Sequence, residues 1–166
     1  ANNNKADLFI SLHANASVRG SVTGAEVFYL SLGDYGVQAQ RVAQGESEAL
    51  PVFGGGTRDI ELILWDMAQA EHLEESSSLA SRIQEELAGV TGSEGRGVKQ
   101  APFRVLVGAA MPAVLVEMGF ISNPEQEKQL TSDAFQSTLV QALVESVVAF
   151  RSARSDRVEY PAPPDG

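Results

Sequence analysis

The sequence predicts an α/β domain in which helices flank a mixed β-sheet. Short apolar runs, typical of buried strands, occur at residues 8–12, 25–30 and 113–116. Longer segments with apolar residues at helical spacing lie between and after these runs. At 166 residues the chain is long enough for one domain with a substantial core.

The run at residues 113–116 ends in a carboxylate. Glu117 follows four apolar residues directly, and a carboxylate buried there is costly unless a cation, a metal or hydrogen bonds receive it. Asn123 and Pro124 then begin a helix, as N-cap and first helical residue, with Gln126 at the third position. Ligands of open α/β sheets bind at the carboxyl ends of strands, and Glu117 stands at such an end.

A histidine ends the first strand in the same way. His13 follows the apolar run at residues 8–12, and the small or polar residues 14–17 come next. A lone histidine is more often a structural residue than a ligand. If the two strands are parallel members of one sheet, however, His13 and Glu117 face the same edge.

The other expected elements support this architecture. We expect a third strand at residues 25–30, a helix capped by Asp59 that the serines at 76–78 bend or split, a loop at residues 89–97, a strand at 103–107 and a last helix from 131–133 onward. The core stripes of the two helices are Ile60, Leu64, Met67, Leu79, Ile83 and Leu87, and Phe135, Leu139, Leu143, Val147 and Phe150. His72, in an acidic helical segment, is interpreted as an ordinary surface histidine.

Two segments stand apart from this domain of residues 1–150. Residues 37–56 form a weakly amphipathic helix followed by three glycines, which is typical of a movable insert. Residues 151–166 are polar and contain three prolines, so we expect a disordered tail or linker.

Composition limits the partners. The net charge of −10 argues against a nucleic-acid binder. Cysteine is absent, which excludes disulfides and thiolate metal sites. The most apolar stretch contains Arg104, Pro112 and Glu117, so we expect no membrane span. No signal peptide is visible, and the first residues suggest a processed, truncated or excised chain.

Two long motifs, in order, resemble a known family. Residues 6–16 (ADLFISLHANA) and 112–127 (PAVLVEMGFISNPEQE) are similar to the two later motifs of zinc-dependent N-acetylmuramoyl-L-alanine amidases. Residues 97–101 (GVKQA) and 66–69 (DMAQ) resemble the same family, so the resemblance covers nearly the whole domain. It implies a mixed, mostly parallel sheet that apparently lacks the first strand–helix units.

The resemblance also implies an activity. Such enzymes use zinc to cleave the amide between N-acetylmuramic acid and the L-alanine of the peptidoglycan stem peptide, in cell-wall remodelling and daughter-cell separation. His13 would be a zinc ligand, Glu117 the catalytic carboxylate and Asn15 part of the pocket wall. An imidazole suits Zn²⁺, and a carboxylate near the attacking water can take its proton. A periplasmic or cell-envelope location, after export, follows from the substrate.

One departure and one regulatory feature come with the resemblance. The family's zinc site resembles a His–Glu–His set, and its first two ligands precede the segment that matches Ala1, so this chain resembles the carboxyl-terminal part of the domain. Residues 42–47 (VAQGES) are similar to the regulatory helix of division amidases, in which a glutamate occupies a zinc position. Glu46 is the matching residue, either as an autoinhibitory metal contact that an activator protein displaces or as an exposed surface carboxylate.

Two alternatives remain open. An inactive amidase-like fragment, or a pseudoenzyme that acts as a peptidoglycan-binding module, would keep the fold without a complete metal site. Another zinc hydrolase, such as a carboxypeptidase, matches the two motifs less well. The presence of the upstream ligands would distinguish the enzyme from the binding module.

Overall fold

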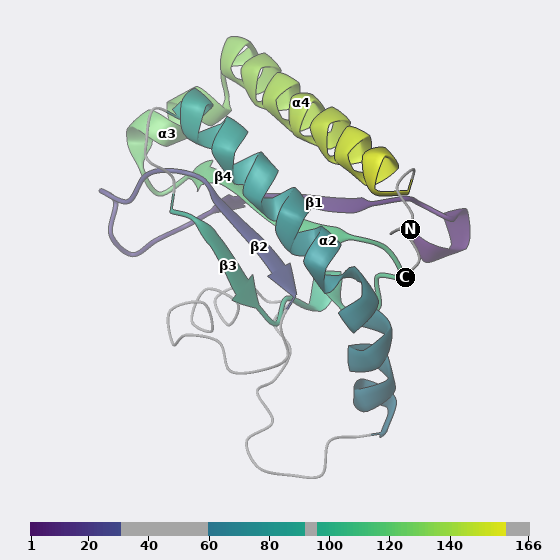
Figure 1. The fold of residues 1–166 in the computed structure, drawn as a ribbon. Helices are drawn as coiled ribbons and strands as arrows, with labels where there is room; N and C mark the ends of the chain where they lie inside the picture. Colours follow the sequence, from purple (N-terminus) through teal and green to yellow (C-terminus); the bar gives the residue numbers. More distant parts are fainter. Residues whose placement is uncertain (31–59, 92–95, 159–166) are drawn as a thin grey trace.

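A computed structural model describes residues 1–30, 60–91 and 96–158 of the chain. In these ranges it contains four strands, β1 (Phe9–Asn15), β2 (Glu26–Leu30), β3 (Val98–Ala101) and β4 (Ala113–Phe120), three α-helices, α2 (Ile60–Thr91), α3 (Pro124–Leu130) and α4 (Asp133–Val158), and two 3₁₀ turns, η1 (Asn2–Asn4) and η2 (Arg104–Leu106) (Figure 1). The α/β prediction is confirmed.

The strands form one mixed sheet in the order β1-β4-β2-β3. β1 pairs with β4 and β2 with β3 in parallel, whereas β2 pairs with β4 antiparallel. β4 has neighbours on both sides, and its burial along nearly its whole length explains its continuous apolar sequence. The carboxyl ends of β1 and β4 therefore lie at the same edge as the amino ends of β2 and β3.

β1 differs from the fully buried strand that we expected. Leu12 is half exposed, and burial alternates from Ser11 to Ala14. β4 is the only partner of β1 among the described strands, so β1 lies at an edge of the sheet. Both motif strands also extend further than their apolar runs. His13 and Glu117 are each the fifth residue of their strand, not residues that follow it.

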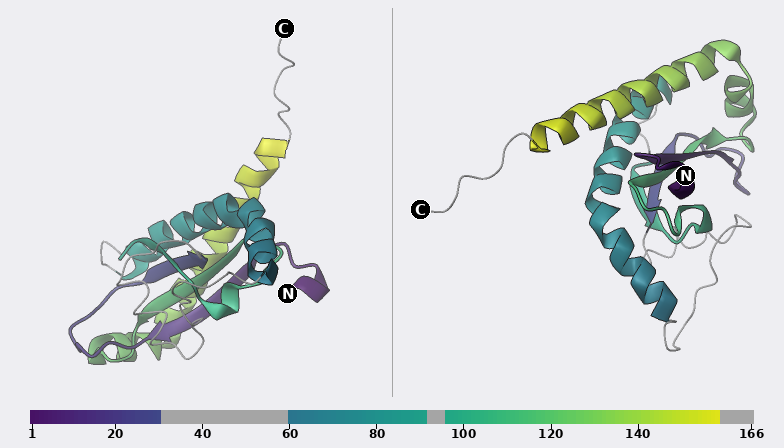
Figure 2. Two further views of the ribbon diagram at one scale, coloured as in Figure 1. Left: turned by 90° about the horizontal axis from the view of Figure 1, so that it is seen from below. Right: turned by 90° about the vertical axis from the view of Figure 1, so that its right-hand side faces the viewer.

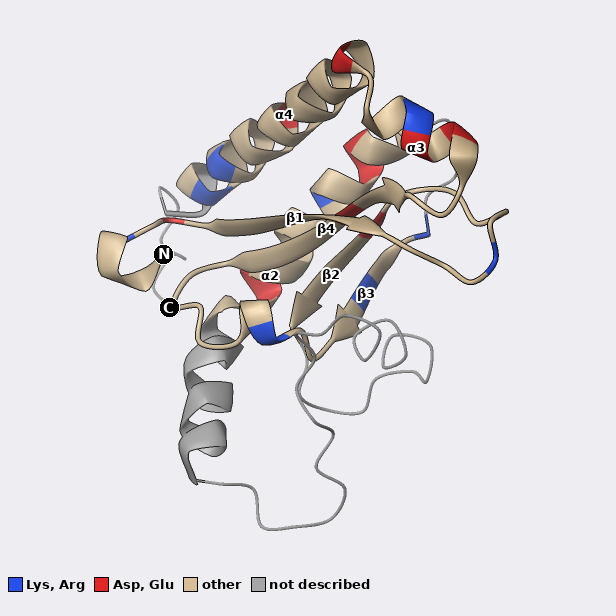
Figure 3. Cartoon of the chain, turned by 180° about the vertical axis from the view of Figure 1, so that it is seen from behind, with Lys and Arg blue, Asp and Glu red and all other residues tan. Residues whose placement is uncertain are grey.

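The two faces of the sheet are covered by different elements. α2 and α4 lie together across one face (Figures 1 and 2), where Val27, Val114 and Val116 of the sheet join one core cluster with Leu79, Ile83, Leu87, Leu139, Ala142 and Phe150. The other face carries Phe28 and Leu115, which pack with Phe103 and Leu106 around η2. Figure 3 shows this second face from behind, without a long helix across it.

Two local predictions between α2 and β4 were wrong. Residues 103–107 are not a strand, because η2 occupies 104–106. The strand in this part of the chain is β3, at Val98–Ala101. The side chains of Phe103 and Leu106 both point into the second core cluster, as a turn allows. The predicted loop at 89–97 begins later, because α2 continues through Thr91.

The serines at 76–78 do not split α2. The Ser76 hydroxyl is buried and lies 3.0 Å from the backbone N of Ala113, which donates to it at the start of β4. A small hydroxyl side chain at this point therefore lets the helix approach the sheet and supplies a hydrogen bond to β4.

α4 runs past the boundary that the sequence predicted. The prediction of a disordered tail at 151–166 was wrong for residues 151–158, which continue the helix. Arg154 Nε lies 3.1 Å from Glu75 Oε1, so an ion pair to α2 links this last part of α4 to the domain. Residues 159–166 lie outside the described part of the chain, as does the predicted insert at 37–56.

Candidate active site

His13 and Glu117 are direct neighbours on the sheet. They are in register on the parallel strands β1 and β4, so both side chains project from the same face. Glu117 is fully buried and His13 is partly exposed. The Ser11 hydroxyl, two residues earlier on the same face, lies 2.9 Å from His13 Nε2 and orients the ring. The predicted meeting of the two residues at one sheet edge is confirmed.

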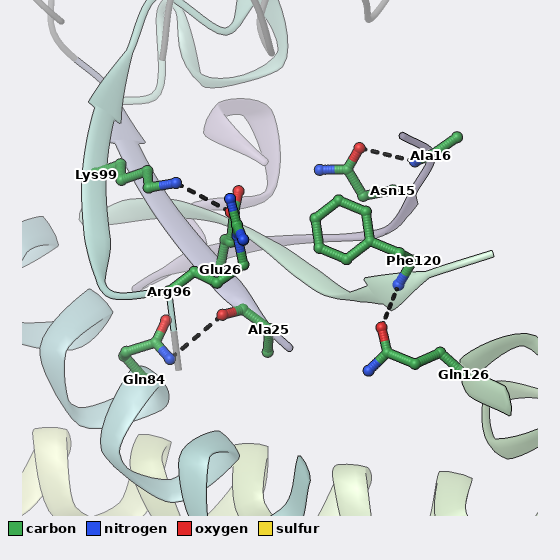
Figure 4. Close-up of polar contacts among 9 residues, drawn as sticks. All are labelled: Asn15, Ala16, Ala25, Glu26, Gln84, Arg96, Lys99, Phe120 and Gln126. Carbon is green, nitrogen blue, oxygen red and sulfur yellow. Dashed lines mark hydrogen bonds and ion pairs between the residues drawn. The ribbon is translucent and has the colours of Figure 1, made fainter. Parts of the chain in front are cut away.

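A second buried carboxylate flanks Glu117 on its other side. Glu26, the first residue of β2, is in register with Glu117 and is 1% exposed. Its Oε1 accepts from Lys99 Nζ at 3.0 Å (Figure 4) and also from Arg96 Nε, so that both cations form ion pairs with Glu26. The two cations come from the start of β3 and the residues before it. They stabilise a carboxylate that burial would otherwise penalise.

A bulge brings an aromatic ring to the same face. His13 pairs with Glu117, but Asn15 pairs with Phe120, so β4 has one residue more than β1 in this interval. Strict alternation would turn Phe120 to the opposite face, and the extra residue turns it to the side of Glu117. The Arg96 guanidinium carbon lies 5.6 Å from the centre of the Phe120 ring, a cation–π distance.

The start of α3 supports this bulge. Gln126 is buried, and its Oε1 accepts from the backbone N of Phe120 at 2.9 Å (Figure 4). Asn123 accepts from the backbone N of Glu125 and of Gln126, which confirms the predicted N-cap. It also donates to the Gly20 carbonyl oxygen at 2.9 Å. The cap therefore fixes the helix that supports the site strand.

Asn15 lies on the site face, as a residue of a pocket wall would. It is 6% exposed, and its Oδ1 accepts from the backbone N of Ala16 at 2.7 Å. This contact fixes the amide orientation and makes Nδ2 the buried donor, which has no hydrogen-bond partner among the described residues. Its predicted place in a pocket wall stays a prediction.

The structure separates His72 from the site and leaves Glu46 outside. His72 belongs to α2, which covers the opposite face, and its Nδ1 lies 3.5 Å from Glu75 Oε2. Glu46 lies outside the described residues, so its contact with the site remains untested.

Sequence reasoning missed three residues of this cluster. Glu26, Arg96 and Lys99 converge next to Glu117, yet none was singled out. Glu26 carries the same signal as Glu117, a lone carboxylate in an apolar strand. The antiparallel pairing of β2 with β4, which places the two carboxylates side by side, has no signature within either strand.

The metal is only partly accounted for by the residues described. His13 is a suitable zinc ligand. However, no group of three or more histidine, cysteine, aspartate or glutamate residues within the described ranges could hold a metal ion. Glu117 lies beside His13, but these two residues are fewer than the three or four ligands that a zinc site uses. The described residues alone therefore do not form a complete zinc site.

A hollow of about 340 Å³ lies elsewhere, at the opposite end of β1. Phe9, Asn2, Val105 and Val107 are among its lining residues. Phe9 precedes His13 by four residues along the strand, so this hollow is separate from the carboxylate cluster.

None of the described helices has the length and hydropathy that a membrane crossing requires.

Fold and site together define an α/β domain with a buried carboxylate beside an imidazole at one sheet edge. The chain belongs to the N-acetylmuramoyl-L-alanine amidase family, whose pattern matches residues 1–149. The resemblance seen in the two motifs is thereby confirmed.

Curated relatives extend well beyond the matched region. N-acetylmuramoyl-L-alanine amidase AmiA of Escherichia coli K12 is 34% identical over 155 residues, which cover 90% of this chain and 54% of AmiA. AmiC of Neisseria meningitidis is 34% identical over 147 residues, 86% of this chain and 35% of AmiC. The chain thus spans about half the length of AmiA and about a third of this AmiC.

Solved structures share the fold. The catalytic domain of the amidase CwlV from Bacillus (Paenibacillus) polymyxa is 26% identical, with a TM-score of 0.61 over 92% of this chain and 62% of that domain. An amidase from Clostridium difficile 630 has a TM-score of 0.64 at 23% identity, over 91% of this chain and 61% of that one. The mixed sheet with its flanking helices is therefore the amidase fold.

Proposed function

We propose that the chain acts in hydrolysis of the amide between N-acetylmuramic acid and the L-alanine of the peptidoglycan stem peptide. The observation that carries the proposal is the in-register pair of His13 and Glu117 on one sheet face, in a chain that belongs to this amidase family. The corresponding biological role is cell-wall remodelling and daughter-cell separation, in the periplasm or cell envelope.

Glu117 is the proposed general base. Its carboxylate would take the proton of the attacking water and pass it to the leaving amine of L-alanine. Burial beside Glu26 and its two cations restricts water around this group, and burial of that kind strengthens electrostatic interactions within a site. Ser11 would hold the imidazole of His13 in a fixed orientation.

Zinc is part of the proposal, with His13 as one ligand and the remaining ligands outside the described residues. When bound, the ion would polarise the scissile carbonyl and lower the pKa of water to about 7. The alternative of a peptidoglycan-binding module without turnover has one observation in its favour, since the described residues offer no complete ligand set.

Regulation is proposed from sequence alone. Residues 37–56 would act as an autoinhibitory lid, in which Glu46 fills a zinc position until an activator protein binds the displaced lid. A carboxylate oxygen is a competent zinc ligand, and the three glycines at 54–56 could serve as a hinge.

The deciding experiment is product analysis. Purified sacculi are incubated with the protein and zinc, and the soluble products are identified by mass spectrometry. Amidase activity releases stem peptides with an unblocked L-alanine amino terminus and leaves the glycan strands intact. Binding to sacculi without release of peptides would support the binding module, and products cut within the stem peptide would indicate a carboxypeptidase.

A further inference from the structure

Two cations are concentrated beside the candidate base of a strongly acidic chain. The sequence has 12 Lys and Arg residues against 22 Asp and Glu residues. Arg96 and Lys99 both form ion pairs with Glu26. Glu26 is in register with Glu117 on the neighbouring strand. The two positive charges of Arg96 and Lys99 balance the two carboxylates. An anion that approaches this face therefore meets about zero formal charge locally, although the whole chain carries −10.

Arg96 is held at several points and still reaches solvent. Its backbone N donates to the Ala25 carbonyl oxygen at 3.1 Å, its Nε donates to Glu26, and its guanidinium lies over the Phe120 ring. The side chain is nevertheless 34% exposed. A guanidinium carries five N–H donors in a planar fork that matches a carboxylate. Within the described residues, Nε is the only nitrogen of this side chain seen to donate.

Asn15 contributes a second, independent observation. Its Nδ2 is buried and has no acceptor among the described residues. Figure 4 shows Asn15 beside Phe120, with its Nδ2 directed toward the side where Arg96 and Glu26 lie. A buried amide donor without an acceptor costs free energy, which a bound oxygen would recover.

We propose that Arg96 and Asn15 form a subsite for a carboxylate of the stem peptide, on the residue that follows L-alanine. This assignment rests on the proposed amidase function. Neighbouring strands lie about 4.8 Å apart, so Arg96, which contacts Glu26 on β2, lies roughly one to two strand spacings from Glu117 on β4. An extended peptide advances about 3.5 Å per residue. A group one or two residues beyond the cleaved amide therefore reaches Arg96.

Calorimetric binding of two synthetic muramoyl peptides tests the subsite. The peptides differ only in the residue after L-alanine, which carries either a free carboxylate or a primary amide at the same carbon. Hydrolysis is prevented with Glu117→Gln and EDTA in every arm. We expect the carboxylate peptide to bind about tenfold more tightly, a difference typical of a charge-assisted fork. Arg96→Gln should reduce this preference to less than about twofold.

The matched control is Arg104→Gln. Arg104 is exposed on η2, beyond the carboxyl end of β3, whereas Arg96 precedes the amino end of that strand. The Arg104→Gln variant has the same change in net charge as Arg96→Gln and should keep the tenfold preference for the carboxylate peptide. Arg96→Lys retains a cation for Glu26 but lacks the fork, and should lower the preference at least threefold. If Arg96→Gln does not fold, the affinities of Arg96→Lys for the two peptides test the subsite instead.

The outcomes separate this proposal from the amidase function. Equal affinity for the two peptides, an unchanged preference in Arg96→Gln, or no binding of either peptide at millimolar concentration would overturn the subsite even if sacculi are hydrolysed. A clear carboxylate preference without release of stem peptides from sacculi would support the subsite and contradict the amidase function.

Discussion

Glu26 and Glu117 stand directly opposite each other on the antiparallel strands β2 and β4, and both are buried. Two like charges in cross-strand register are destabilising in themselves. Here Arg96 and Lys99 offset the pair from one side, through Glu26. The arrangement keeps a second carboxylate and two cations next to the candidate base.

The charge of Glu26 should stabilise the fold. Glu26→Gln leaves Arg96 and Lys99 without their carboxylate, and loss of one partner of a buried pair is costly. Because both cations are partly exposed, water can solvate them, and we expect a loss of about 1–3 kcal/mol in the free energy of unfolding. Urea denaturation measures this loss, with Glu86→Gln on the exposed side of α2 as control. A more stable Glu26→Gln protein would mean that repulsion from Glu117 dominates.

Substitutions of Glu117 and of His13 should differ in their effect on zinc content. In protein that contains the complete zinc ligand set, Glu117→Gln removes the proton acceptor but no ligand, so hydrolysis of sacculi should fall by about 10²–10⁴-fold while zinc content is unchanged. His13→Ala should lose both activity and zinc. Dye release from labelled sacculi and metal analysis of the same samples provide the two readouts. Near-normal turnover in Glu117→Gln would contradict its role as base.

Substitution of Glu46 in the proposed lid should raise hydrolysis, whereas substitution of Glu117 or His13 should lower it. If Glu46 occupies a zinc position, Glu46→Ala should raise basal hydrolysis about tenfold or more, since each 1.4 kcal/mol of stabilisation lost by the closed state gives one decade. The assay is dye release without any added activator, with zinc content measured in parallel. Activity at or below the parent level with unchanged zinc would leave Glu46 as an exposed surface carboxylate.

Helix burial can be tested within the long helices. Ile83 on α2 is fully buried in the core cluster, so Ile83→Ala should cost about 2–5 kcal/mol of unfolding free energy. Val144 on α4 is 55% exposed, so Val144→Ala should change it by less than about 0.5 kcal/mol. Denaturant midpoints give both values. A large loss at Val144 would show that this exposed face of α4 is covered in solution.

The sequence predicts best where one residue reports on its own environment. The apolar run before Glu117, the stripe of Leu79, Ile83 and Leu87, and the cap at Asn123 are local signals, and the structure confirms them. Pairing between strands is not local, so the contact of Glu26 with its cations was missed. The strand expected at 103–107 was wrong because apolar side chains also fill a core from a 3₁₀ turn.

The bulge in β4 provides the final prediction. Gln126 Oε1 accepts from the backbone N of Phe120, a buried donor that the bulge removes from regular pairing. Gln126→Leu keeps a similar volume but leaves this donor unsatisfied, so we expect a loss of about 1–3 kcal/mol in unfolding free energy. Gln126→Glu retains an acceptor and should lose less. Denaturation measures both, and hydrogen exchange at the Phe120 amide should accelerate only in Gln126→Leu. Equal stability of Gln126→Leu and the parent would show that the bulge does not depend on α3.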